Sequence, residues 1–170
     1  LKAMMRSLRL PQHLFVLLAV LLLGSCASGP RYPTEGVELS LTPQQAVSEA
    51  TTLRGRTILW GGMIINSTNL KDQSRLEILA YPLDSNQYPQ SDSPPLGRFL
   101  VLAEGYLETV DYAPGRLVTV RGPLTGTESG KVGETGYVYP VVKTRDIHLW
   151  SRAGRSDPRV HFGVGVVFGR

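Results

Sequence analysis

The apolar and polar positions divide the start of the chain into distinct zones. Residues 1–9 are basic, and an unbroken run of ten apolar residues follows at 14–23. As a helix that rises about 1.5 Å per residue, this run would span roughly 15 Å, about half of the hydrocarbon core of a bilayer. That length is too short for a stable transmembrane helix and is typical of the core of a signal peptide. We therefore predict that residues 1–25 form a signal peptide.

The apolar run ends at Leu23-Gly24-Ser25-Cys26, and Cys26 is the single cysteine of the chain. This ending resembles the bacterial lipobox, in which an aliphatic residue and two small residues precede a cysteine whose thiol forms a thioether with diacylglycerol. The resemblance implies cleavage between Ser25 and Cys26, followed by S-diacylglycerol and N-acyl modification of Cys26. Because two or more lipid chains anchor a protein stably, this covalent lipid would hold the chain at a membrane, and we expect no other cofactor. The alternative is an ordinary secretory signal with a chance cysteine near its end.

The segment after the lipobox is polar. Residues 26–41 are rich in Gly, Pro and polar side chains, which predicts a flexible tether that carries the lipid and separates the domain from the bilayer. A short helix is predicted next, over 42–50, because Thr42 suits the N-cap and Pro43 suits the first helical position. Gln45 completes a capping box. We assign no chemistry to this helix.

From residue 54 the pattern changes to short apolar runs separated by turn residues. These runs predict five strands, at 56–66, 75–81, 99–103, 116–121 and 138–150. Gly61 and Gly62 lie inside the first strand and predict a bulge or a sharp coil there. The pattern predicts an all-β domain over 42–151, namely a small five-stranded closed barrel, similar to an OB-fold, with one short N-terminal helix. A two-sheet sandwich is the alternative.

Two segments of this domain lack strand patterning. The segment 82–97 is long for a connection in a compact domain, and its composition predicts a mobile loop. The segment 126–132 vaguely resembles a phosphate-binding loop. It has three residues between its glycines where that motif has four, and Val132 stands where the motif has Ser or Thr. We therefore predict that it is a hairpin loop.

Sequence blocks between residues 54 and 150 resemble the Slp (starvation-inducible) outer-membrane lipoproteins of Gram-negative bacteria. The blocks that carry the resemblance are RLEI (75–78), YPLD (81–84), GRFL (97–100), GYL (105–107), DY (111–112), GRLVTVRG (115–122), G (126), GKVGE (130–134), YPVV (139–142) and LW (149–150). The resemblance implies a lipoprotein of the outer membrane, expressed under carbon starvation or in stationary phase, with no enzymatic activity and no catalytic residues. Cys26 alone carries over as a functional site, and Ala27 after it favours the outer membrane over the inner one.

The net charge of +4 does not indicate a nucleic-acid partner. From residue 26 onward the chain has 15 Lys and Arg against 14 Asp and Glu, which leaves +1. The tail, 152–170, has four Arg and one Asp, so the body over 26–151 carries about −2. A protein binds a phosphate backbone through several neutralising contacts, and no basic face remains for them. We expect no nucleic-acid partner.

Histidines and carboxylates do not predict a catalytic or metal site. His148 and His161 are not at ligand spacing and there is no second cysteine, so we expect no metal, and His148 is expected to face solvent on its strand. Glu104, Glu108 and Asp111 cluster in the sequence, but paired carboxylates do acid–base work only when one of them lies in an apolar pocket. We expect these three on a solvated rim. The chain is therefore predicted not to be an enzyme.

Basic side chains recur late in the chain. Arg121, Lys143 and Arg145 lie on the last two predicted strands, where we expect a solvated outer face, with an anion-binding face as the alternative. The tail, 152–170, is basic at first and then rich in Gly and Val. Its segment 160–170 is apolar, which is unusual at a C-terminus. This pattern is typical of an extended segment, and the alternatives for it are an added barrel strand, pairing with an envelope protein partner, or contact with lipid.

Together these patterns predict a non-catalytic, lipid-anchored lipoprotein of the starvation or stationary-phase envelope response, located on the periplasmic face of the outer membrane. The alternative is a periplasmic module that binds a small ligand or an envelope component through the barrel face or the 82–97 loop. A pocket lined by converging polar groups would favour the binding module, and a filled barrel would favour the structural role.

Overall fold

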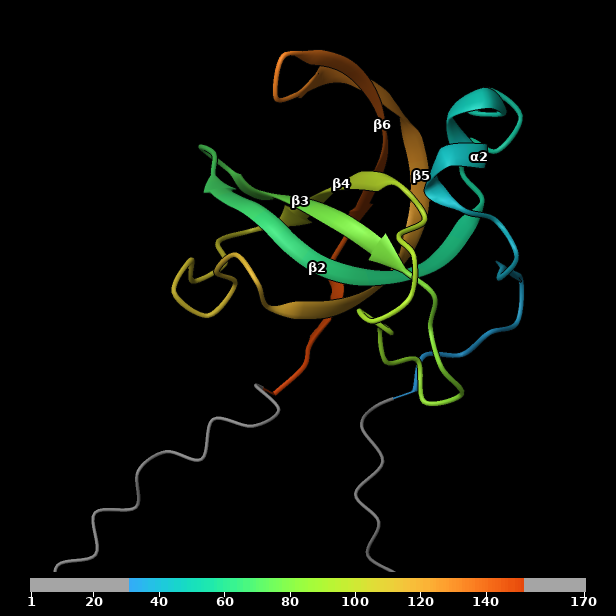
Figure 1. The fold of residues 1–170 in the computed structure, drawn as a ribbon, viewed down its shortest axis with the longest axis horizontal. Coiled ribbons are helices and arrows are strands. Elements are labelled where there is room, and N and C mark those ends of the chain that lie inside the picture. Colours follow the sequence, from blue (N-terminus) through green and yellow to red (C-terminus); the bar gives the residue numbers. More distant parts are fainter. Residues whose placement is uncertain (1–30, 152–170) are drawn as a thin grey trace, which may run out of the picture. The chain divides into compact units, whose positions relative to one another are not determined.

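A computed structural model describes residues 31–151, whose fold is shown in Figure 1. The predicted signal peptide, the lipidation site at Ser25 and Cys26, and the tail 152–170 lie outside the described residues. Within 31–151 the chain is mostly β, with one sheet and one short helix. This confirms the predicted all-β class with a short N-terminal helix.

The described chain contains seven strands and one helix. In order they are β1 (Val37–Glu38), α2 (Pro43–Ser48), β2 (Thr57–Asn69), β3 (Gln73–Tyr81), β4 (Arg98–Glu104), β5 (Leu117–Val132), β6 (Thr135–Thr144) and β7 (Asp146–Leu149). The first three predicted strands correspond to β2, β3 and β4. The last predicted strand, over 138–150, is divided at Arg145 into parts of β6 and β7.

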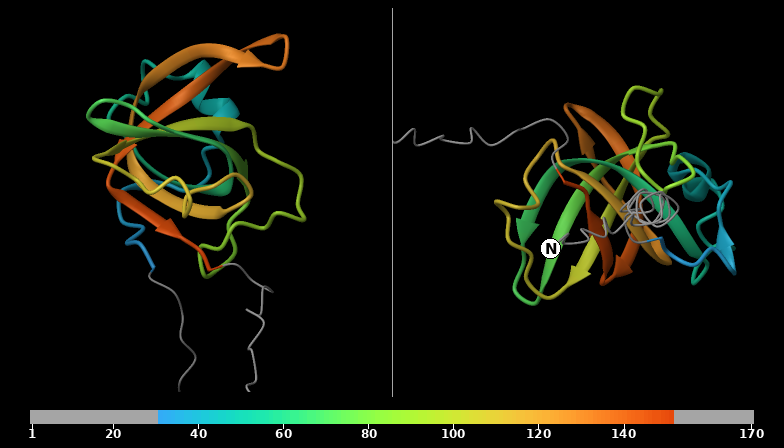
Figure 2. Two further views of the ribbon diagram at one scale, coloured as in Figure 1. Left: turned by 90° about the vertical axis from the view of Figure 1, so that its left-hand side faces the viewer. Right: turned by 90° about the horizontal axis from the view of Figure 1, so that it is seen from below.

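The long strands pair in a continuous order. β3 lies antiparallel between β2 and β4, β4 is parallel to β6, and β6 is antiparallel to β5. β5 also pairs with β2, from Thr57 opposite Pro123 to Met63 opposite Leu117, so each of these five strands has two partners among the five. β1 pairs with β2, and β7 pairs with β5. Figure 2 shows the strands curving around a common interior.

β2 bends where it changes partner. Its first half pairs with β5, its second half pairs with β3, and the two pairings overlap at 61–63. A Cβ on Gly62 would lie 2.0 Å from the carbonyl oxygen of Leu79, so only glycine allows the two backbones to approach this closely. The register shifts directly afterwards, between Ile64 and Asn66. The bulge therefore lies at Ile65, three residues after the glycine pair, and the pairing at Gly61 and Gly62 themselves is regular. The predicted position of the bulge is wrong.

The interior is filled by apolar side chains that alternate along the strands. The buried members of this main core are Ala46, Ile58, Trp60, Ile64, Leu76, Ile78, Ala80, Phe99, Val101, Val118, Val120, Leu124 and Val142. The rings of Trp60 and Phe99 meet edge to face, with centroids 5.1 Å apart. Residues far apart in the sequence therefore meet in one core.

The helix α2 forms as the capping pattern predicts. The Thr42 hydroxyl accepts from the backbone N–H of Gln45 at 3.2 Å, and the Gln45 side chain accepts from the backbone N–H of Thr42 at 2.9 Å. These two bonds satisfy donors that the first turn of a helix leaves without partners. The helix buries Pro43 and Ala46, and it contacts β4 and β6.

The β5–β6 hairpin corrects the prediction of a loop at 126–132. β5 continues through this segment to Val132, and the turn follows at Gly133, whose φ is +60°. The segment consists mainly of polar residues and glycines, so no apolar pattern indicates a strand there. Its backbone pairs with β6, and this pairing does not depend on apolar side chains.

The same hairpin covers the outer face of β4. Phe99 and Val101 face the main core, and side chains alternate along a strand, so Leu100 and Leu102 face the other way. They belong to a second, smaller cluster with residues of the hairpin. Its buried members are Leu100, Tyr139 and Val141, with Leu102, Val132 and Tyr137 packed against them. β4 is therefore buried on both faces.

Candidate functional site

Gln87 connects the N-terminal segment to the 82–97 loop. Its side-chain Oε1 accepts from the backbone N–H of Tyr32 at 2.8 Å, and its Nε2 donates to the Tyr32 carbonyl at 2.9 Å. The Gln87 backbone has φ +64°, in the left-handed region that side chains other than glycine seldom occupy. Its carbonyl accepts from the Thr119 hydroxyl of β5 at 2.7 Å. We call Tyr32, Gln87, Thr119 and Trp150 the Gln87 clamp.

Trp150 brings the C-terminal end of the described chain into this clamp. Its Nε1 donates to the Thr119 hydroxyl at 2.9 Å, and its ring meets the rings of Tyr88 and His148 edge to face, at centroid distances of 5.0 Å and 4.4 Å. Burial raises the pKa of Tyr32 to about 12, with the charge of Asp146 as the second cause. Burial also lowers the pKa of His148. Residues from both ends of the described chain thus converge on one buried threonine.

The 82–97 loop is folded on itself, which corrects its interpretation as mobile. The Asp84 carboxylate accepts from the backbone N–H groups of Asn86 and Tyr88 at 2.7 Å and 2.9 Å. Leu83 pairs with Pro89 as an isolated bridge. The composition of the loop does not reveal that the Asp84 carboxylate closes a local turn, so composition alone predicts a mobile segment.

The described part of the predicted tether is also attached to the domain. Arg121 Nε donates to the carbonyl of Pro33 at 3.2 Å, and β1 pairs with the start of β2. Arg56 forms an ion pair with Glu38 of β1. Residues 32–41 therefore contact the sheet, and the interpretation of this stretch as a free spacer is wrong.

A hollow of about 450 Å³ lies between the N-terminal segment, β2 and the 82–97 loop. Its lining residues are Thr34, Leu39, Ser40, Leu41, Thr42, Leu59, Trp60, Tyr81, Pro82, Leu83, Asp84, Ser85, Gln87 and Leu96. We call it the N-terminal groove. Trp60 is fixed in its wall because Nε1 donates to the Leu41 carbonyl at 2.6 Å, while Leu39 is 60% exposed. Asp84 is engaged in its own turn, so the groove suits an apolar ligand rather than acid–base chemistry.

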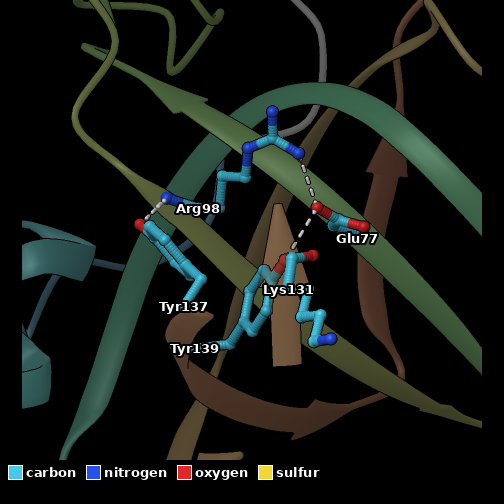
Figure 3. Close-up of polar contacts among 5 residues, drawn as sticks. All are labelled: Glu77, Arg98, Lys131, Tyr137 and Tyr139. Atoms are coloured by element: carbon cyan, nitrogen blue, oxygen red, sulfur yellow. Dashed lines mark hydrogen bonds and ion pairs between the residues drawn. The ribbon is translucent and has the colours of Figure 1, made fainter. Parts of the chain in front are cut away.

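A polar cluster joins β3 and β4 to the β5–β6 hairpin (Figure 3). Glu77 Oε1 accepts from Arg98 Nη1 at 2.7 Å and lies 3.2 Å from the Tyr139 hydroxyl, which is also 3.1 Å from the Lys131 carbonyl. The Tyr137 hydroxyl accepts from the backbone N–H of Arg98 at 2.9 Å. Burial raises the pKa of Tyr139, with the Glu77 charge as the second cause. This Glu77 lock fixes the hairpin to the sheet, and its polar groups are engaged with one another.

The three carboxylates Glu104, Glu108 and Asp111 are exposed, which confirms the predicted solvated rim. Glu104 pairs with Arg145 at 2.6 Å. The three residues border the β4–β5 connection and do not enclose a shared apolar pocket. Their arrangement gives no basis for general acid–base catalysis.

The basic residues near the end of the domain differ in their environments. Lys143 and Arg145 are exposed, as expected of a solvated face, whereas Arg121 is half-buried beside Asp146 at 3.8 Å. His148 is also half-buried against Trp150, so the prediction that it faces solvent is wrong. The alternating pattern of β7 does not reveal that an aromatic residue two positions later covers the imidazole.

In the described range, 31–151, no group of three or more His, Cys, Asp or Glu side chains is arranged to bind a metal ion. In the same range, no helix has the length and apolar character needed to cross a bilayer.

Three bacterial proteins are similar in sequence to this chain. The uncharacterized lipoprotein YeaY of Escherichia coli K12 is 36% identical over 115 residues, which are 65% of this chain and 59% of YeaY. An uncharacterized protein of Haemophilus influenzae is 33% identical over 130 residues, 74% of this chain and 70% of that protein. The outer membrane protein Slp of Escherichia coli K12 is 32% identical over 96 residues, 56% of this chain and 50% of Slp. The matches thus span only part of each relative.

The family model described as the outer membrane lipoprotein Slp family matches residues 23–166. This range begins at the first residue of the lipobox-like sequence and ends inside the tail. It covers most of the chain and confirms the resemblance that the sequence blocks indicate. The chain therefore belongs to the outer membrane lipoprotein Slp family, and its location is the outer membrane.

Proposed function

We propose that this protein is a non-catalytic lipoprotein, anchored to the periplasmic face of the outer membrane by a lipid on Cys26. The observation that carries the proposal is the family match, which begins at Leu23 and so includes the lipobox-like sequence. The charged and polar groups of the domain support the absence of catalysis. Those of the Glu77 lock bind one another, and the rim carboxylates are exposed.

The Gln87 clamp limits the distance between the domain and the lipid. Tyr32 is six residues after Cys26. A fully extended chain spans at most about 3.6 Å per residue, so Tyr32 of the clamp lies within roughly 22 Å of Cys26. We infer that the domain stays close to the bilayer surface, because the part of the tether beyond Tyr32 is attached to the sheet.

We also infer that the sheet closes into a barrel with OB-fold connectivity. The pairing of β2 with β5 supports closure, because it connects the last of the five long strands to the first. The parallel pairing of β4 with β6, between otherwise antiparallel neighbours, supports the Greek-key order of that fold. Among the strands of residues 31–151, closure would leave only the short β1 and β7 as edges, which lowers the risk of edge-to-edge aggregation.

Substitution of Cys26 tests the anchor directly. We expect mass spectrometry of the mature protein to show a chain that begins at Cys26 and carries a diacylglyceryl thioether and an amide-linked acyl chain. We expect Cys26→Ala to remove the protein from the outer-membrane fraction, whereas Ser28→Ala, two residues away, leaves it there. An unmodified thiol on mature protein would overturn the proposal.

The same proposal assigns the protein to the envelope response to starvation. We expect its abundance to rise when carbon is exhausted, and we expect a deletion strain to show increased outer-membrane permeability in stationary phase. Complementation with the Cys26→Ala variant should fail if the lipid-anchored form is the active one. Equal permeability of deletion and parent strains under starvation would contradict this role.

The N-terminal groove favours a second candidate function, a binding module for a small apolar ligand. Its volume of about 450 Å³ lies in the range of ligand sites, roughly 300–1,000 Å³. We expect the apolar dye N-phenyl-1-naphthylamine to bind saturably to the full mature chain, and Leu83→Asp to abolish this binding. Val138→Asp, which changes an exposed apolar residue of β6, is the matched control. Absence of saturable binding would leave the structural role alone.

A further inference from the structure

Two connections at one end of the sheet present apolar side chains to solvent. Tyr106 and Val110, in the connection between β4 and β5, are each 72% exposed, and Leu70, in the turn between β2 and β3, is 45% exposed. Single exposed apolar residues are common, but three on adjoining connections indicate a contact surface. We call these three residues the Tyr106 patch.

The two connections are joined by hydrogen bonds beneath the patch. Asn69 Nδ2 donates to the Leu107 carbonyl at 3.1 Å, and the backbone N–H of Leu107 donates to Ser74 Oγ at 2.8 Å. Ser74 is fully buried. The patch therefore rests on a fixed support, and a partner would not have to order these connections before it binds.

The exposed charge beside Tyr106 and Val110 is negative. Glu108 and Asp111 are both exposed, and neither carboxylate forms an ion pair with another residue of 31–151. The nearby Arg116 donates from Nη1 to the Asp111 carbonyl, at 2.8 Å. An occupant that combines apolar residues with cations would complement this surface, whereas an anionic lipid surface would be repelled.

The C-terminal segment of the same chain has that combination and starts beside the patch. Residues 152–159 include Arg152, Arg155 and Arg159, and the apolar segment 160–168 follows directly. The second terminal nitrogen of Arg116, Nη2, donates to the Trp150 carbonyl at 2.9 Å. One guanidinium therefore contacts both the backbone of Asp111 and the backbone of Trp150. Nine residues, 151–159, lie between Trp150 and the start of the apolar segment, and this length of chain can reach up to about 35 Å.

We propose that the Tyr106 patch is the docking surface for the C-terminal segment 160–168 of the same chain, with the arginines of 152–159 facing Glu108 and Asp111. The connection through Trp150 makes the docking intramolecular, so modest contacts suffice to populate it. Increasing salt weakens the docking, because its charged contacts are exposed. This inference goes beyond the proposed function and does not depend on the lipid.

A photo-crosslinker placed in the patch tests the proposal in the full mature chain. We expect p-benzoylphenylalanine at position 110 to form crosslinks to residues 160–168 within a monomer, as mapped by mass spectrometry. The same probe at Val138, which is also exposed but lies on the hairpin, should not reach this segment. Crosslinks from position 110 only to lipid, only to a second copy, or to neither would each overturn the proposal.

Charge reversal on both sides separates docking from an effect on folding. The pair Arg155→Glu and Arg159→Glu should lower the crosslink yield by about three-fold or more, as expected for two exposed ion pairs. Adding Glu108→Arg and Asp111→Arg to that pair should restore the yield. Failure of the combined variant to recover, with an unchanged circular dichroism spectrum, would show that charge complementarity does not guide the contact.

Discussion

Phe99 and Leu100 are neighbours on β4, yet they belong to two regions that are built differently. Phe99 lies in the main core, whose buried members are all apolar and carry no titratable side chain. Leu100 lies under the β5–β6 hairpin, where the Glu77 lock adds hydrogen bonds to the packing. The outer layer comprises this lock and the Gln87 clamp. It attaches the hairpin, and the segments around Tyr32 and Trp150, to a sheet that the main core already defines. Packing therefore determines the fold, and polar contacts determine what is fixed to its outside.

The largest effect is expected from truncation in the main core. Phe99 is fully buried and in edge-to-face contact with Trp60, so Phe99→Ala should lower the free energy of unfolding by about 3–5 kcal/mol. Urea denaturation followed by tryptophan fluorescence and by circular dichroism should give coincident transitions. A loss below about 1 kcal/mol would mean that the interior is not the main source of stability.

A smaller and more local effect is expected from the Glu77 lock. Tyr139→Phe keeps the ring but removes the hydroxyl that contacts Glu77 and the Lys131 carbonyl, which should cost about 1–2 kcal/mol. Amide hydrogen exchange should speed up over 127–138 and change little in β2 and β3. Tyr106→Phe, at an exposed tyrosine, is the matched control and should have almost no effect. If Tyr139→Phe destabilised the whole sheet as much as Phe99→Ala, the distinction between the two regions would fail.

The same distinction explains which parts of the fold are predictable from the sequence. The strands β2, β3 and β4 follow apolar runs, and the helix α2 follows a capping pattern that lies within four residues. By contrast, β5 beyond Leu124 is polar and rich in glycine. Its partners in the Glu77 lock come from distant positions, since Tyr139 is 62 residues from Glu77. The pattern of residues that are adjacent in the sequence does not indicate contacts between positions so far apart.

The candidate site divides in the same way. The lipobox-like sequence is contiguous, so the prediction of Cys26 as the lipidation site needs only neighbouring residues. The Gln87 clamp depends on a glutamine that meets Tyr32 across 55 residues, and nothing near either residue indicates the pairing. The N-terminal groove needs both the clamp and the folded 82–97 loop, so it follows only from the tertiary structure.

Alkaline pH should weaken the outer layer before it affects the main core. Burial raises the pKa of Tyr32 from 10.0 to about 12, so the folded state retains a proton that the unfolded state releases. The stability due to this shift is complete below pH 10 and is lost as the pH rises through about 12. Between pH 9.5 and 11.5, wild type should therefore lose more stability than Tyr32→Phe. Parallel losses in the two proteins would show that the Tyr32 phenol is not buried in the clamp.

The smallest effect is expected from His148, on the acid side. Burial against Trp150 lowers its pKa below 6.5, so the unfolded state binds a proton more readily than the folded state. The corresponding stability is complete above pH 6.5 and is lost as the pH falls below that value. His148→Gln should reduce the slope of unfolding free energy between pH 7.5 and 5.5, as measured by urea denaturation. Phe99→Ala should lower the whole curve and keep the wild-type slope, because the main core around it has no titratable group among its buried residues. If the slope changed with Phe99→Ala and not with His148→Gln, the pH-sensitive contacts would lie in the main core and not at His148, which would contradict the prediction.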